Sequence, residues 1–242
     1  MILNKILSTI KQIRDLEPQI FLDYDGTLVP IINDPEKSYA DSELFYILDY
    51  FFRKYETFVV TGRSLNEIRG FIGNYNIIAL HGGIYYINGN IIEVYNYQKY
   101  VNVCNNIYDN RDEYLREFPN LRVYNKNGGI LFHMGNIKNS DERRGLLKKV
   151  KYLGARVNMD TYMGKDILEL RIPYINKGEA IKRIRNTSRP AIIIGDDITD
   201  EEAFMENADA ITIKVGNETT VAKYSINFEL VRELLIDIIN IK

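Results

Sequence analysis

The sequence predicts an α/β protein with a doubly wound parallel-sheet core and an inserted α+β cap domain. Short apolar runs alternate with amphipathic helical segments over the first 83 residues, which is typical of a parallel sheet covered by helices on both faces. The pattern then changes to half-exposed strands, and the first pattern returns near Ile172. We therefore expect a split core formed by residues 1–83 and 172–242, with residues 84–171 forming the cap.

The core elements are predicted in order from short apolar runs and from apolar residues at helical spacing. Lys and Arg residues alternate with isoleucines and leucines at the N-terminus, which indicates an amphipathic first helix. A second helix is predicted from apolar positions between Leu44 and Phe52. Ser64 with Glu67 three residues later predicts a capping box for the third helix, and Lys177 opens another. The predicted core strands are residues 19–22, 57–60, 77–80 and 191–194.

The cap is predicted from strands in hairpins that lie on one side of two helices. Asn88-Gly89-Asn90 is typical of a hairpin turn. The predicted helices are residues 101–118 and 140–153, and the predicted strands are residues 84–86, 91–94, 121–124 and 130–132.

Composition and charge exclude several classes of protein. Hydrophobic residues make up 45% of the 242 residues and charged residues 26%, which excludes a disordered or fibrous chain. The net charge of -2 argues against a nucleic-acid partner, because backbone binding needs a basic face. No apolar run approaches the roughly 20 residues that span a membrane. Cys104 is the single cysteine, so we expect a cytoplasmic protein without an internal disulfide.

Four polar clusters follow apolar runs or open a helix, and they carry the predicted chemistry. Residues beyond the carboxyl ends of neighbouring parallel strands meet at one crevice, so clusters far apart in the sequence can share a site. Converging carboxylates repel each other unless a cation lies among them, and their hard oxygen atoms suit Mg²⁺. A lysine and a threonine hydroxyl beside them suit a phosphoryl group. The clusters are Asp23 with Asp25, Thr61-Gly62-Arg63, Lys177-Gly178, and Asp196 with Asp197 and Asp200.

The first cluster offers a nucleophile and a proton-transfer group. Aspartate carboxylates form aspartyl-phosphate intermediates, so Asp23 can attack a phosphoryl group. Asp25 lies two residues further along an extended segment, and we expect it to project to the same side and to exchange a proton with the leaving oxygen. The residues therefore predict phosphoryl transfer.

The first cluster resembles the first motif of the haloacid dehalogenase-like (HAD) phosphatases in the stretch Phe21-Leu22-Asp23-Tyr24-Asp25-Gly26-Thr27-Leu28. The other clusters resemble the remaining motifs of these phosphatases, in the same order. A narrower resemblance is to the trehalose-6-phosphate phosphatase family. The cap between Tyr86 and Met163 carries almost none of it. The residues that carry it are Val29-Pro30-Ile31 with Pro35 and Ala40, Gly164-Lys165, Glu169-Leu170-Arg171, Asn176-Lys177-Gly178, and the stretch from Gly195 to Phe204.

The resemblance implies Mg²⁺-dependent hydrolysis of trehalose 6-phosphate through an aspartyl-phosphate on Asp23. It implies that Mg²⁺ is held by the Asp23 carboxylate, the Asp25 main-chain carbonyl and Asp196. Asp200, with Asp197, would orient the groups around the metal. The phosphoryl group would be bound by Thr61 and Lys177.

Substrate choice is expected to lie in the cap, by the same resemblance. Lys165 and Glu169 match residues that bind sugar hydroxyls in the family, and a carboxylate accepts such hydroxyls well. A trehalose-6-phosphate synthase, which makes the substrate, is the expected functional partner. Gly62 and Arg63 are also expected to bind the substrate. The residues expected at the rim of the site are Arg63, His81, Gly82 and Arg171.

Several alternatives remain open on the sequence. Asp197 can instead cap the helix that follows it, and Arg63 can serve a structural ion pair. Lys165 and Glu169 can pair across a strand without any ligand. At the level of function, the alternatives are a HAD phosphatase of another sugar phosphate or glycosyl phosphate, and a catalytically silent regulatory partner of a glycosyltransferase.

Overall fold

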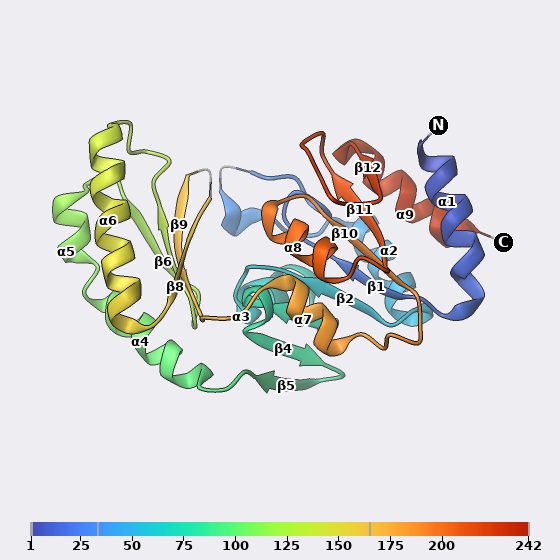
Figure 1. Cartoon of the computed structure of the whole chain (residues 1–242), viewed down its shortest axis with the longest axis horizontal. Coiled ribbons are helices and arrows are strands. Elements are labelled where there is room, and N and C mark those ends of the chain that lie inside the picture. Colours follow the sequence, from blue (N-terminus) through green and yellow to red (C-terminus); the bar gives the residue numbers. More distant parts are fainter. Residues whose placement is uncertain (1, 33, 165, 242) are drawn as a thin grey trace. The chain divides into compact units, whose positions relative to one another are not determined.

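The largest element of the computed structural model is an eight-stranded sheet in the order β12-β11-β10-β1-β2-β3-β4-β5 (Figure 1). The strands from β12 to β3 are parallel, and β4 pairs antiparallel with β3. Every residue of β1 (Gln19–Leu22), β2 (Thr57–Val60), β10 (Ala191–Gly195) and β11 (Ile211–Val215) is buried, as expected of strands covered on both faces. The remaining strands are β3 (Ile77–Ala79), β4 (Ile84–Ile87), β5 (Asn90–Glu93) and β12 (Tyr224–Ile226).

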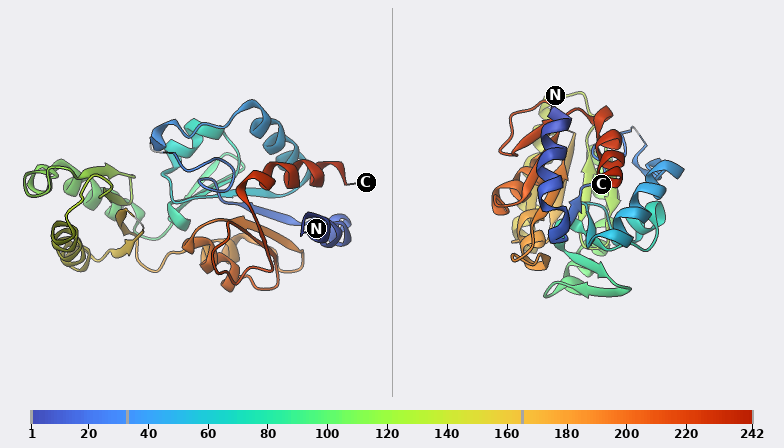
Figure 2. Two further views of the ribbon diagram at one scale, coloured as in Figure 1. Left: turned by 90° about the horizontal axis from the view of Figure 1, so that it is seen from above. Right: turned by 90° about the vertical axis from the view of Figure 1, so that its right-hand side faces the viewer.

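Helices lie on both faces of this sheet, with α2 and α3 on one side and α7 and α8 on the other (Figure 2). Each buries an apolar stripe, as α2 does with Leu44, Ile47, Leu48 and Phe51. This arrangement confirms the predicted α/β class and the doubly wound parallel core. The helices are α1 (Ile2–Ile13), α2 (Ser42–Lys54), α3 (Leu65–Ile72), α7 (Lys177–Ile184), α8 (Ile198–Glu206) and α9 (Val231–Asn240), and the 3₁₀ turns are Arg14–Leu16, Pro35–Lys37, Leu80–Gly82 and Phe228–Leu230.

A second unit consists of a four-stranded antiparallel sheet, in the order β6-β7-β9-β8, with helices packed against it. Its apolar residues form a core of their own, which includes Ile130, Phe132, Leu146 and Leu168. Its elements are α4 (Tyr97–Asp109), α5 (Asp112–Glu117), β6 (Arg122–Asn125), β7 (Ile130–His133), α6 (Ser140–Val157), β8 (Asp160–Met163) and β9 (Ile167–Arg171).

The structure describes residues 2–32, 34–164 and 166–241. The chain divides into two compact units: the first consists of Met1–Ile92 and Asn176–Lys242, and the second of Glu93–Ile175. The sequence prediction placed residues 84–171 in the cap, whereas β4 and β5 extend the large sheet. The predicted helix 101–118 is two helices, α4 and α5, because the chain turns between Asp109 and Asp112. Within the described ranges, no helix combines the length and the apolar character needed to cross a membrane.

Candidate active site

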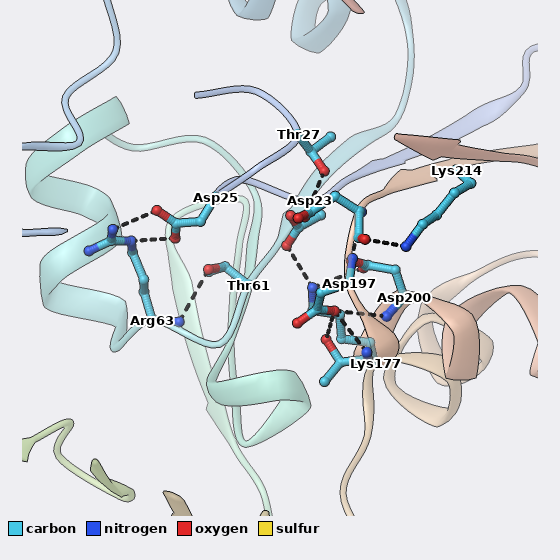
Figure 3. Close-up of polar contacts among 11 residues, drawn as sticks. Asp23, Asp25, Thr27, Thr61, Arg63, Lys177, Asp197, Asp200 and Lys214 are labelled. Atoms are coloured by element: carbon cyan, nitrogen blue, oxygen red, sulfur yellow. Dashed lines mark hydrogen bonds and ion pairs between the residues drawn. The ribbon is translucent and has the colours of Figure 1, made fainter. Parts of the chain in front are cut away.

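The carboxyl ends of three adjacent strands bring the predicted clusters together (Figure 3). Asp23 follows β1, Thr61 follows β2 and Asp196 follows β10, and β1 lies between the other two strands. The backbone hydrogen bonds of the sheet continue one residue past β1 and β2, since Asp23 N donates to Ile194 O at 2.9 Å and Thr61 N to Ile78 O at 2.9 Å. Parallel pairing therefore fixes the position of Asp23 and Thr61 at one edge of the sheet.

Lys177 connects two of these clusters through its ammonium group. It opens α7, whose N-cap is Asn176, and its Nζ donates to Asp23 Oδ1 at 2.6 Å and to Asp200 Oδ1 at 2.9 Å. All three side chains are buried. Burial opposes the charge on Lys177, but Asp200 and Asp23 outweigh that effect and raise the pKa of its ammonium group. Lys177 therefore stays charged inside the protein.

The loop after β1 packs directly on Asp196. Gly26 has φ +85°, and a Cβ built on it would lie 2.1 Å from Asp196 Oδ2. Thr27 Oγ1 donates to Asp196 Oδ1 at 3.3 Å. A side chain at position 26 would displace Asp196, so the Gly-Thr part of the first motif is explained by this contact.

Asp23, Asp196 and Asp200 form a set of carboxylates that could hold a metal ion. One oxygen atom from each lies within 4.8 Å of the others. Asp23 Oδ2 is buried and has no hydrogen-bond partner among the residues that the structure describes. Burial raises the pKa of Asp23 and of Asp200, and together with Asp200 and Asp197 it raises the pKa of Asp196 to about 6. A divalent cation would supply the missing partner and offset this repulsion, so the residues fit a metal with hard oxygen ligands.

The loop that carries Asp196 is held by its own backbone and by one more lysine. Asp200 Oδ2 accepts from the N–H groups of Asp196 and Asp197, each at 3.1 Å. Asp197 caps α8, accepting from Thr199 N at 2.8 Å, as its alternative interpretation predicted. Lys214 of β11, which is buried, donates to the Asp196 carbonyl oxygen. Lys214 was not predicted from the sequence, because it binds a carbonyl oxygen rather than a side chain of one of the motifs.

Arg63 and Asp25 form a second charged group at the same sheet edge. Arg63 Nε and Nη2 each donate at 2.6 Å to one oxygen of Asp25, and Nη1 donates to Glu67. Glu67 therefore binds Arg63, while Ser64 caps α3 by accepting from Glu67 N at 3.3 Å. Asp23 contacts Lys177 whereas Asp25 contacts Arg63, because the strand ends at Leu22 and the alternation of an extended chain does not continue through Tyr24.

The loop after β3 supports the Thr61–Arg63 loop. His81 N donates to Thr61 O at 3.0 Å, and a Cβ on Gly62 would lie 2.4 Å from His81 Nε2. Leu80 and His81 have positive φ angles of 50° and 56°, and Gly82 follows with 110°. The histidine ring therefore packs on the glycine face, which explains why position 62 has no side chain.

In the second unit, Glu169 is buried between two cations. Lys126 Nζ lies 2.7 Å from Glu169 Oε1, and Arg171 Nε lies 2.8 Å from Glu169 Oε2. The Arg171 guanidinium also lies 3.7 Å from the centre of the Tyr162 ring. Lys126 was not predicted from the sequence, because no strand spacing relates it to Glu169. Lys165, the other predicted sugar-binding residue, lies outside the described residues.

A Gly195→Ala substitution is expected to damage this site by steric displacement. The added Cβ would lie 2.2 Å from Asp200 Cγ, so Asp200 must move away from its backbone donors and from Lys177. We expect activity to fall about 10- to 100-fold and unfolding free energy to fall by about 1–3 kcal/mol. Kinetics and urea unfolding measure both effects.

Gly70→Ala is the matched control for that substitution. Gly70 lies on the exposed side of α3, and a Cβ there meets nothing within 4 Å. Alanine should therefore stabilise the protein by about 0.5–1 kcal/mol with activity unchanged. If Gly195→Ala and Gly70→Ala changed activity and unfolding free energy equally, the position of Asp200 would not matter for either.

The raised pKa of Asp196 predicts how stability depends on pH without metal. The folded protein keeps this proton up to a pH of about 6, whereas the unfolded chain releases it near ~3.9. Stability should therefore fall as pH rises from about 4 to 6, by up to about 3 kcal/mol. Urea midpoints in EDTA measure this, and Asp196→Asn should flatten the slope. A slope that Asp196→Asn leaves unchanged would assign the effect to other groups.

Comparison with known proteins identifies the family of this chain. The trehalose-phosphatase family matches residues 21–228, which include every described site residue. The chain belongs to the trehalose-phosphatase family. The predicted family resemblance is thus confirmed. A trehalose-6-phosphate phosphatase-related protein of Thermoplasma acidophilum is 44% identical over 208 residues, covering 86% of this chain and 90% of that protein.

Solved structures with the same fold include other trehalose-phosphatases. The structure of a trehalose-6-phosphate phosphatase-related protein superposes with a TM-score of 0.86 at 42% identity, covering 92% of this chain and 97% of the other. The C-terminal domain of the trehalose-6-phosphate phosphatase of C. albicans shares the fold with a TM-score of 0.79 at 22% identity, covering 100% and 98%. A HAD-like hydrolase of B. subtilis shares it at 14% identity and a TM-score of 0.59, covering 89% and 99%, which confirms the HAD-like fold.

Proposed function

We propose that this trehalose-phosphatase family member hydrolyses trehalose 6-phosphate to trehalose and phosphate. The observation that carries the proposal is the contact of Lys177 Nζ with both Asp23 Oδ1 and Asp200 Oδ1, within the stretch that matches the family. This contact joins a buried carboxylate nucleophile to a buried positive charge. Such a pair attracts a phosphoryl group and lets the carboxylate attack it.

In the proposed reaction, an oxygen of Asp23 attacks the phosphorus while the bond from phosphorus to the sugar oxygen breaks. Asp25 gives its proton to the departing sugar oxygen. Asp25 then takes a proton from a water molecule whose oxygen attacks the phosphorus. The bond from phosphorus to the Asp23 oxygen breaks, which releases phosphate and restores the Asp23 carboxylate. Lys177 stabilises the charge on the phosphoryl oxygens, and Thr61, buried beside Asp23, binds one of them.

The metal proposed for this site is Mg²⁺. Asp23, Asp196 and the Asp25 main-chain carbonyl are the proposed ligands, and Asp200 is either a fourth ligand or the residue that orients them. When bound, the ion would neutralise negative charge on the phosphoryl group. Two observations support this assignment: Asp23 Oδ2 has no hydrogen-bond partner among the described residues, and the three carboxylates repel one another.

Sugar recognition is proposed for the second unit. Glu169, buried beside Lys126 and Arg171, is the proposed acceptor of sugar hydroxyls, with Lys165 as a second contact. A bifunctional trehalose-6-phosphate synthase/phosphatase of Thermoproteus tenax is 27% identical over 234 residues, covering 89% of this chain and 31% of that protein. It supports functional pairing of our chain with a synthase that makes its substrate. The buried free thiol of Cys104 fits the predicted cytoplasmic location.

The test is phosphate release from a panel of sugar phosphates with Mg²⁺. Trehalose 6-phosphate is compared with glucose 6-phosphate, mannose 6-phosphate and sucrose 6-phosphate, with EDTA as the metal-free control. We expect trehalose 6-phosphate to be preferred by about 10²-fold or more in kcat/KM, and Glu169→Gln to reduce that preference. Similar rates on all four would replace this substrate by a broader class of sugar phosphates. No release from any would favour a catalytically silent regulatory partner.

A further inference from the structure

Arg63 is fixed in place independently of Asp25. Its guanidinium carbon lies 4.7 Å from the centre of the Phe71 ring, and Nη1 donates to Glu67 one helical turn along α3. Its main-chain N–H donates to Thr61 Oγ1 at 3.1 Å, and its carbonyl accepts from Leu80 N at 3.0 Å. The side chain is 8% exposed. The guanidinium therefore has a defined position and orientation.

Asp25, by contrast, is held mainly through Arg63. Its side chain is 34% exposed, and its two carboxylate oxygens accept from Arg63 Nε and Nη2, each at 2.6 Å (Figure 3). Two parallel hydrogen bonds to one planar group fix the rotation of a carboxylate. A carboxylate has about four acceptor sites, so this fork leaves room for a proton on either oxygen. These two hydrogen bonds from Arg63 therefore set the direction in which the Asp25 carboxylate points.

We propose that Arg63 is a positioning residue that aims Asp25 for proton transfer, and that it does not bind the phosphoryl group of the substrate. Three of the five guanidinium N–H groups, one each on Nε, Nη1 and Nη2, already donate to the carboxylates of Asp25 and Glu67, so these two residues set its orientation. This inference rests on the proposed function, in which Asp25 protonates the leaving sugar oxygen. It assigns Arg63 a role different from the substrate contact expected from the sequence.

The nature of the leaving group distinguishes the two roles. A sugar hydroxylate leaves poorly and needs a proton from Asp25, whereas the anion of p-nitrophenol leaves readily without one. The value of kcat/KM reports the first transfer of the phosphoryl group, so it is compared for trehalose 6-phosphate and p-nitrophenyl phosphate. We expect Arg63→Gln to lower kcat/KM by about 10²-fold or more for trehalose 6-phosphate and by less than about 10-fold for p-nitrophenyl phosphate.

Asp25→Asn separates failure of this inference from failure of the proposed function. Asp25→Asn should likewise lower kcat/KM much more for the sugar phosphate than for the aryl phosphate. The double variant with Arg63→Gln should have the same kcat/KM as Asp25→Asn alone. If Asp25→Asn affects both substrates equally, the proposed role of Asp25 is wrong. Two outcomes would overturn the inference and show that Arg63 acts on the phosphoryl group. In the first, Asp25→Asn lowers kcat/KM more for the sugar phosphate, but Arg63→Gln lowers it equally for both substrates. In the second, the losses of kcat/KM caused by the two single substitutions multiply in the double variant.

Two further variants keep the test independent of folding. Arg63→Lys retains the charge but cannot form the fork, so it should show the same discrimination if Arg63→Gln does not fold. Arg185→Gln is the matched control, since Arg185 is also buried and donates through Nη1 and Nη2 to Asp209, at 2.8 and 2.5 Å. It should lower stability and leave the ratio between the two substrates unchanged. A changed ratio in that control would show that general destabilisation causes the effect and would refute the inference.

Discussion

Asp23→Asn is expected to lower kcat by about 10⁴- to 10⁶-fold, the range found when an enzyme loses its nucleophile. An amide oxygen cannot form the aspartyl-phosphate, and neither Asp196 nor Asp200 can replace it. Asp200 already binds Lys177 and two backbone donors, and Asp196 is packed against Gly26. Residual phosphate release is measured in long incubations with Mg²⁺ and trehalose 6-phosphate.

The same substitution should leave the fold intact. Asp23 is buried with one oxygen unpartnered among the described residues, and burial raises its pKa. Replacing this carboxylate by a neutral amide of the same shape removes that electrostatic cost, while Lys177 keeps Asp200 as its partner. We expect the metal-free variant to unfold at the same urea concentration as the natural protein or at a higher one. A near-normal rate in the folded variant would exclude Asp23 as the nucleophile.

Lys177→Met should produce the second large effect, on both stability and activity. It leaves Asp23 and Asp200 buried without their shared cation, and removal of one partner of a buried ion pair costs about 3–5 kcal/mol. The phosphoryl group also loses the charge that stabilises it, so kcat should fall by about 10²- to 10³-fold. Urea unfolding and steady-state kinetics measure the two losses.

Lys182→Met provides the control within the same helix. Lys182 is 52% exposed and binds Glu206 at 3.2 Å on the outside of α7. Loss of such a surface pair should change unfolding free energy by less than about 1 kcal/mol and leave kcat unchanged. If Lys177→Met were no more harmful than Lys182→Met, the buried lysine would contribute neither to folding nor to catalysis.

The core of the fold could be predicted because its strands are short continuous apolar runs and its helices carry apolar stripes. The predicted ranges 19–22 and 57–60 agree with β1 and β2, and Asp23 and Thr61 follow them directly. Parallel order then places these residues at one edge without any knowledge of side-chain contacts. The edge strands were harder, because the exposed residues of β5 give little sign of the sheet that they join.

The candidate site was predictable only as far as strand ends determine it. Lys126 was missed since it meets Glu169 across 43 residues, and Lys214 was missed since it acts on a carbonyl group rather than on a motif side chain. The direction of Asp25 was not predictable either, because it follows the end of β1 and depends on Arg63. Such contacts arise from loop geometry and tertiary packing, which local sequence patterns do not encode.

The central claim, phosphoryl transfer to Asp23, is tested most directly by trapping the phosphorylated protein. Asp25→Asn is mixed with p-nitrophenyl phosphate and Mg²⁺, quenched in acid and examined by mass spectrometry. The aryl group leaves without a proton, but water attacks slowly without Asp25, so the intermediate should accumulate. We predict one added phosphoryl group, located on Asp23. Turnover with no phosphorylated protein, or a phosphoryl group on another residue, would contradict the account.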